Sequence, residues 1–131
     1  MRHISVFLYL TTFLTGAAVL VIEVAAVRML APYYGSSLPV FSSVLTTILG
    51  ALSLGYYLGG VLADRHPYLR TLYALIGVSG LATLLSLFLS VQVMPIIAPA
   101  FTLFSGPLLF SVLLFFVPAA LLGVVSPYLV K

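Results

Sequence analysis

The sequence holds two acidic side chains, and one of them, Glu23, lies within a long apolar stretch. An ionisable group inside a bilayer costs at least ~2.5 kcal/mol on insertion scales, so it usually faces a polar partner or water. This placement makes Glu23 the candidate for a proton or cation site. The structural alternative is a hydrogen bond that Glu23 accepts from a Ser or Thr of a neighbouring helix.

Arg28 follows Glu23 by five residues, which places the two side chains more than a third of a turn apart on a helix. A direct ion pair within the helix is therefore not the natural geometry. We expect Arg28 to extend to the outer membrane interface, where Tyr33 and Tyr34 suit an aromatic belt. Contact with an anionic ligand or with Glu23 of another subunit is the alternative, which makes Arg28 a candidate interface residue.

Polar side chains recur at helical spacing along the second apolar stretch. Four of them could donate hydrogen bonds to a small solute and join Glu23 as candidate ligand-binding residues. The complete polar face consists of Ser43, Thr46, Gly50, Ser53, Tyr57 and Asp64. The four candidate hydrogen-bond donors to a solute are Ser43, Thr46, Ser53 and Tyr57.

A stripe of small residues lies nearly opposite that polar face, at Ala51, Gly55, Gly59 and Ala63. Small residues at every fourth position let helix backbones approach closely in lipid, so Ala51, Gly55 and Gly59 are candidate interface residues. With one polar face and one close-packing face, this helix is expected inside the bundle with neighbours on both sides. The alternative is that both patterns serve packing alone.

Four long apolar stretches must position these side chains, over about residues 4–30, 39–63, 67–93 and 106–130. Hydrophobic residues make up 63% of the chain and charged residues 5%, which lies outside the range of soluble domains. A helix needs about 20 apolar residues to cross a membrane. Long, continuously apolar runs indicate helices rather than barrel strands. We therefore predict an all-α, multi-pass membrane protein with a single domain over residues 1–131.

Basic residues gather at the ends of these stretches and predict the orientation of the chain. They are Arg2 and His3, then Arg65, His66 and Arg70, and finally Lys131. By the positive-inside rule, we expect both termini and the 64–70 connection to be cytoplasmic. We expect the protein itself to lie in the inner or plasma membrane of the cell. The N-terminal apolar region is too long for a signal peptide, so it is expected to stay as a helix.

The same composition excludes several classes of chemistry. The chain has no Cys, so it forms no disulfide or thiolate metal site, and its two His in a basic setting make a poor metal site. The sequence contains no catalytic triad pattern, phosphate loop or dinucleotide motif. We expect no catalytic residue, cofactor, metal or nucleic-acid partner for this chain alone.

The third and fourth stretches carry packing signals. Hydroxyl residues share a face of the third at Ser79, Thr83, Ser86 and Ser90, which indicates contact between helices. Pro118 and Pro127 interrupt the fourth, and each frees a backbone carbonyl. Such a break can line a cavity or fit a bend, and the sequence does not choose between them.

The end of the second stretch resembles the start of the signature between helices two and three of major facilitator transporters. Gly60, Asp64 and Arg65 match its Gly, Asp and basic positions, whereas the later Gly-Arg-Arg portion is absent. This likeness implies that the three residues form a cytoplasmic gate or a structural motif. An Asp here could also serve as an ordinary helix N-cap.

A longer stretch resembles the membrane portion of fused major-facilitator/spermidine synthase proteins. It runs from Gly16 through Glu23, Arg28 and the Pro-Tyr-Tyr-Gly-Ser-Ser segment at 32–37 to Arg65, and the segment 123–130 is similar to the end of that family's fourth helix. This resemblance implies a major-facilitator-like half-bundle of four helices. It also implies a small cationic, polyamine-like solute.

The chain departs from that family because no aminopropyltransferase-like domain follows before Lys131. We therefore expect a membrane transport or scaffold module that binds lipid and self-associates, with Glu23 as the charge partner of the solute. In a homo-oligomer, two copies would approximate the pseudo-symmetric halves of a transporter. The alternative is an anchor that transports nothing and holds a separate spermidine-synthase-like enzyme.

Overall fold

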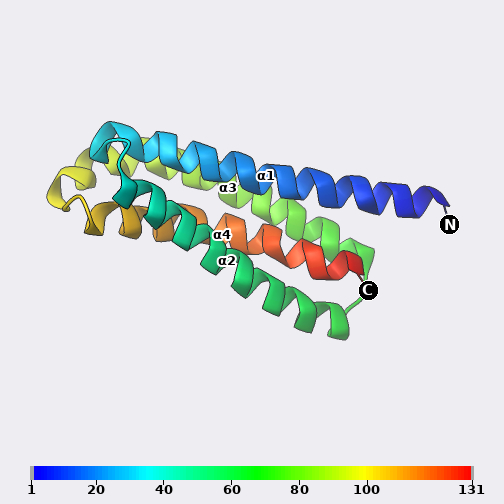
Figure 1. The fold of residues 1–131 in the computed structure, drawn as a ribbon. Coiled ribbons are helices and arrows are strands. Elements are labelled where there is room, and N and C mark those ends of the chain that lie inside the picture. The colour runs from blue at the N-terminus through cyan, green and yellow to red at the C-terminus, as the bar shows by residue number, and fades with distance from the viewer. Residues whose placement is uncertain (1, 131) are drawn as a thin grey trace.

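Four long helices form the protein in a computed structural model that describes residues 2–130 (Figure 1). They are α1 (Arg2–Tyr34), α2 (Leu38–Arg65), α3 (Leu69–Ile97) and α4 (Ser105–Val130), with a short 3-10 helix, η1 (Ala98–Ala100), after α3. Each long helix has the length and apolar composition to cross a membrane. The predicted fold class, an all-α multi-pass membrane protein, is confirmed at this level.

The helix ends fall within a few residues of the predicted ones, and their differences have local causes. α1 continues through Pro32 and ends at Tyr34, just before Gly35, whose φ of 76° lies in the left-handed region that glycine adopts freely. α3 begins at Leu69 instead of Pro67, with Tyr68 in the N-cap position. Asp64 lies in the last turn of α2, so the alternative that Asp64 caps the next helix is wrong.

α4 is the central helix of the bundle. It packs against α1, α2 and α3, and it has more buried residues than any other helix. α2 also contacts α1, but its polar face remains on the outside of the bundle. The expectation that α2 is the interior helix is therefore wrong. α4 takes that place because its nearly continuous apolar surface can be covered from several sides, whereas α2 has one close-packing face.

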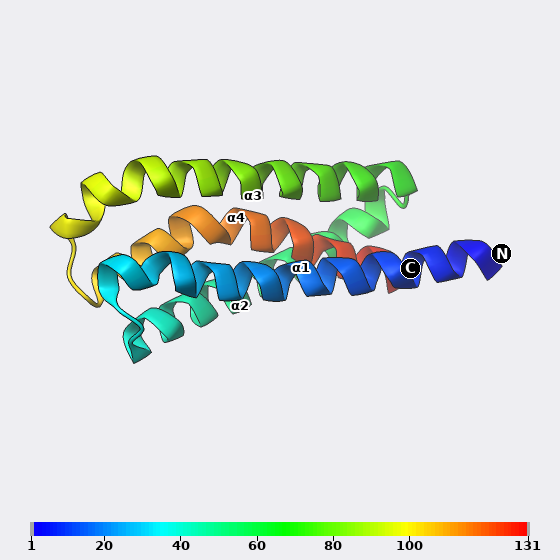
Figure 2. The same cartoon turned by 90° about the horizontal axis from the view of Figure 1, so that it is seen from above.

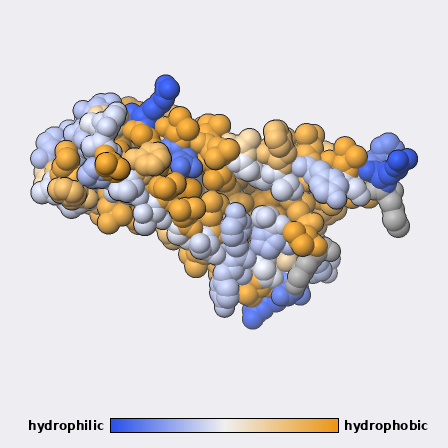
Figure 3. Space-filling model, viewed as in Figure 1, coloured by the Kyte–Doolittle hydropathy of each residue, from blue (hydrophilic) through white to orange (hydrophobic). Residues whose placement is uncertain are grey.

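The described chain ends and the α2–α3 connection lie at one end of the bundle, and the other two connections lie at the opposite end (Figure 1). α1 and α3 therefore run in one direction, and α2 and α4 run in the other. Hydrophobic residues cover much of the long side of the molecule that Figure 3 shows. This surface is typical of a bundle whose solvent is the lipid bilayer.

Candidate functional site

Glu23 lies in the middle part of α1 beside the buried row that includes Ile22 and Ala26. Its side chain is half-buried. Within residues 2–130, Glu23 forms no hydrogen bond or ion pair. The structural alternative, in which a Ser or Thr of a neighbouring helix donates to Glu23, is therefore not formed in a single chain. A carboxyl group at this depth remains available to a partner from outside the chain.

A small crevice lies one to two turns from Glu23, where α1, α2 and α4 meet. Its volume is about 100 Å³, and its walls include Gly16 and Val19 of α1, Tyr56 of α2 and Ser126 of α4. Since one water occupies about 30 Å³ of liquid, this space holds about three water molecules. It is too small for a polyamine, and Glu23 does not line it.

The hydroxyl groups predicted to bind a solute do not converge on Glu23. Ser43 is half-buried, whereas Thr46, Ser53 and Tyr57 are exposed on the outside of α2, with 70% of Tyr57 accessible. The Ser53 hydroxyl donates to the carbonyl of Leu49 in its own helix at 2.8 Å. One chain therefore presents Glu23 and the polar face of α2 as separate features.

The small-residue stripe of α2 packs directly on α4. A Cβ atom added at Gly55 would meet the Ala120 carbonyl oxygen and the Gly123 backbone. One added at Gly59 would meet the Val124 backbone and the Pro127 ring. Ala51 is completely buried along the same seam. The close backbone approach explains why glycine occupies these positions.

A polar contact between α3 and α4 was not predicted from the sequence. Pro118 is fully buried and has no N–H, so the Leu114 carbonyl lacks its usual helical donor. The Ser86 hydroxyl oxygen lies 2.5 Å from that carbonyl and 2.8 Å from the Ala82 carbonyl of its own helix, so its one proton can be donated to either. The proline signalled the free carbonyl and the serine face signalled a donor, but their pairing depends on how the helices pack. Ser86 of α3 thus lies beside the carbonyl that Pro118 leaves free.

Two buried hydroxyls in the core have no hydrogen-bond partner within the described chain. They belong to Thr47 of α2, which is 4% exposed, and to Ser111 of α4, which is completely buried. Buried hydroxyls usually find an acceptor, so these two positions are exceptions in the bundle. No sequence pattern indicated them, because their burial depends on how the helices pack together.

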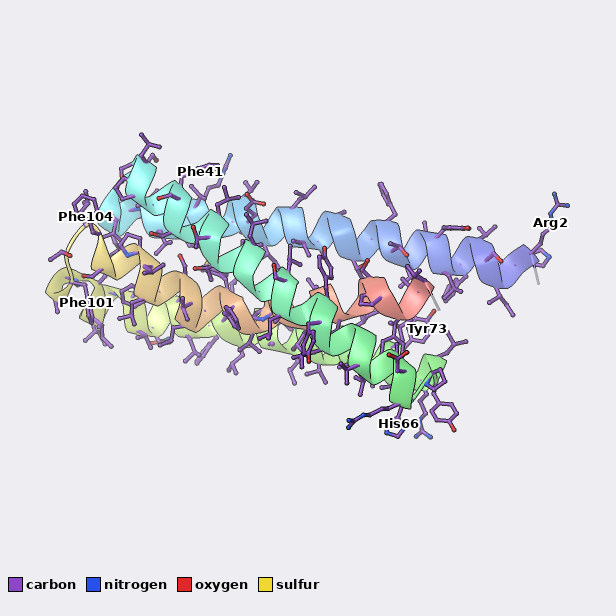
Figure 4. The ribbon with its side chains drawn as sticks, turned by 60° about the horizontal axis from the view of Figure 1, so that its bottom comes forward. Arg2, Phe41, His66, Tyr73, Phe101 and Phe104 are labelled. Carbon is purple, nitrogen blue, oxygen red and sulfur yellow. The ribbon has the colours of Figure 1, made fainter. Side chains whose placement is uncertain are left out.

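The motif residues Gly60, Asp64 and Arg65 lie in the last two turns of α2. Asp64 and Arg65 are exposed, and His66 follows them at the same end of the bundle (Figure 4). The Tyr128 hydroxyl donates to the His66 carbonyl at 2.7 Å and ties the end of α4 to the α2–α3 connection.

Arg28 is exposed near the other end of α1. It lines a shallow hollow with Leu20, Val21 and Val24, on a side of α1 that faces away from the other helices. Within residues 2–130 it has no ion-pair partner, and Glu23 is not close enough to pair with it. Arg28 is therefore accessible to the membrane interface or to another molecule.

The fold and composition define the class of protein, a multi-pass helical membrane protein. In the described part of the chain, no group of three or more His, Asp or Glu side chains could hold a metal ion. Comparisons of the chain with protein-family models, with curated proteins and with solved structures find no match.

Proposed function

We propose that the chain is a membrane transport or scaffold module that acts only as part of a larger assembly, most simply a homo-oligomer. One observation carries this proposal. The polar face of α2, with Thr46, Ser53 and Tyr57, lies on the outside of the bundle rather than in its core. The Thr46 and Tyr57 hydroxyls have no hydrogen-bond partner among residues 2–130. Such groups gain hydrogen bonds in lipid when another helix covers them, which favours association through this face.

An oligomer also resolves the separation of the candidate site residues. Glu23 belongs to α1, while the exposed hydroxyls of α2 point away from the core of the same chain. In an assembly, the α2 face of one copy can lie beside Glu23 of the next. A small cationic, polyamine-like solute would then have a carboxylate and several hydroxyls around it. The solute class follows from the resemblance to the spermidine-synthase-like membrane domain.

In this proposal both termini and the α2–α3 connection are cytoplasmic, in a major-facilitator-like half-bundle. The described chain ends and this connection lie at the same end of the bundle, as that orientation requires. Gly60, Asp64 and Arg65 would stabilise the cytoplasmic end of α2, where Tyr128 already fixes the start of the connection.

The second candidate function is an anchor for a separate aminopropyltransferase-like enzyme. It is favoured by the exposed polar side chains Arg65, His66 and Arg70 at one end of the bundle. These residues would lie in water beyond the membrane, where a soluble partner could bind them.

Substitution of Glu23 distinguishes the two functions. Binding of radiolabelled spermidine to the purified protein in lipid nanodiscs should be lost in Glu23→Gln and partly retained in Glu23→Asp, which keeps the charge. Circular dichroism and gel filtration establish that each variant is folded. Unchanged spermidine binding by folded Glu23→Gln rejects the transport proposal. No spermidine binding by the wild type, together with a co-purifying nucleotide-fold enzyme, supports the anchor.

A further inference from the structure

A long groove separates α1 from α3 on the side of the bundle away from α2. Both helices pack on α4 without forming an extensive seam with each other, as the two views in Figures 1 and 2 show. The groove has a volume of about 720 Å³ and is open to the surface, and Leu122 of α4 contributes to its floor. Neither proposed function uses this groove.

The walls of the groove offer almost no unsatisfied polar group. Four Ser and Thr side chains line it, and each donates to a carbonyl of its own helix. These bonds join Thr11 to Phe7 (2.8 Å), Thr15 to Thr11 (3.0 Å), Ser79 to Ile76 (2.7 Å) and Thr83 to Ser79 (2.8 Å). Since these donors are already used, the groove suits an apolar occupant.

The dimensions of the groove indicate a hydrocarbon chain. It extends from Thr11 to Ile22 on α1 and from Tyr73 to Leu84 on α3, which is about 16 Å at the helical rise. Half of a bilayer's hydrocarbon core is about 15 Å. The volume divided by this length gives a mean cross-section of about 45 Å², less than that of a helix about 10–12 Å across. The groove therefore fits chains of one leaflet better than a whole helix.

The end of the groove nearest the α2–α3 connection carries a hydroxyl and a positive charge. Tyr73 lines this end, and its hydroxyl has no hydrogen-bond partner among residues 2–130. Arg70 precedes Tyr73 by three residues, which makes the two side chains neighbours on the surface of α3. Both are exposed at the end of the bundle that carries the α2–α3 connection (Tyr73 is labelled in Figure 4). The acid at this end, Asp64, belongs to α2 and already takes part in an interaction.

We infer that the α1–α3 groove is a binding site for an anionic phospholipid of the surrounding bilayer. An acyl chain fills the apolar groove down to the level of Leu84 and Ile22. The phosphate lies at the end nearest the α2–α3 connection, where Arg70 supplies charge and the Tyr73 hydroxyl donates a hydrogen bond. This lipid would fix the spacing of α1 and α3, which have little direct contact.

Two glycines of α3 provide a matched pair of variants. Gly80 lines the groove and Gly77 does not, yet a Cβ added at either meets no atom within 4 Å. Leucine at either position should therefore be accommodated, and only Gly80→Leu fills the space meant for the lipid. Native mass spectrometry from nanodiscs containing equal amounts of phosphatidylglycerol and phosphatidylcholine measures the lipid retained by each protein.

We expect the wild type and Gly77→Leu to retain one phosphatidylglycerol, and Gly80→Leu to retain at least tenfold less. Arg70→Gln should remove the preference for phosphatidylglycerol over phosphatidylcholine without removing lipid binding. Equal retention by Gly80→Leu and Gly77→Leu would overturn the assignment of the groove. Equal retention of both lipids by the wild type would overturn the role of Arg70. A wild-type oligomer that Gly80→Leu alone converts to monomers would show instead that a second copy occupies the groove.

Discussion

Replacement of Gly55 by alanine tests the close contact between α2 and α4. The added Cβ would meet the Ala120 carbonyl oxygen and the backbone of Gly123, and neither can rotate away as the tip of a side chain can. The two helices must therefore move apart along the seam that also includes Gly59. We expect Gly55→Ala to destabilise the bundle.

The magnitude follows from two opposing effects. Alanine in place of glycine stabilises a helix interior by about 0.5–1 kcal/mol. Overpacking a tight contact costs about 1–3 kcal/mol, and the backbone position of the clashing atoms favours the upper part of that range. The net loss should therefore be about 1–2 kcal/mol. A Cβ added at Gly60 meets no atom within 4 Å. Only the gain from alanine in a helix interior then applies, so Gly60→Ala should stabilise the protein by up to about 1 kcal/mol.

Unfolding by SDS in mixed micelles, followed by circular dichroism, measures both variants against the wild type. Gly50 provides a second control, since its added Cβ also meets no atom within 4 Å. The reasoning is refuted if Gly55→Ala is as stable as Gly60→Ala and Gly50→Ala. That result would mean that α2 and α4 do not approach as closely as the structure places them.

Two polar contacts can be tested, the first by the same unfolding assay and the second by proteolysis. Ser86→Ala should lower the free energy of unfolding by about 0.5–1.5 kcal/mol, because the Leu114 carbonyl then has no donor. The same substitution should cost less in a Pro118→Ala background, where an N–H at position 118 can bond that carbonyl. An equal loss of stability in both backgrounds would contradict the pairing. Tyr128→Phe should remove the hydrogen bond to the His66 carbonyl and therefore speed tryptic cleavage within the α2–α3 connection several-fold. An unchanged cleavage rate would show that Tyr128 does not hold this connection.

The two faces of α2 illustrate how far sequence patterns reach in a membrane protein. The small-residue stripe predicted a close helix contact, and Gly55 and Gly59 indeed lie against α4. The hydroxyl pattern predicted a polar face, but its placement inside the bundle was wrong for this chain. A stripe of glycines packs well only when the backbone of another helix lies close against it. Exposed hydroxyls such as that of Ser53 can instead form their hydrogen bond within their own helix.

For Arg28 and Glu23, too, the sequence predicted one feature and left another open. Their five-residue spacing correctly argued against an ion pair within α1, because helix geometry alone fixes that angle. The spacing could not tell which neighbour would lie beside Glu23. The structure leaves this carboxyl without a polar partner within residues 2–130. Its role therefore stays a prediction that the spermidine-binding assay must test.

The sequence by itself determined the four helices and their approximate ends. Backbone amides have no partners in lipid, so an apolar stretch of this length must satisfy them internally as a helix. Only the tertiary structure decided that α4 is central, that Ser86 pairs with the carbonyl freed by Pro118, and that α1 and α3 leave a groove between them. The physical reason is that lipid is as apolar as a leucine side chain, so hydrophobicity does not distinguish a face that meets lipid from a face that meets another helix.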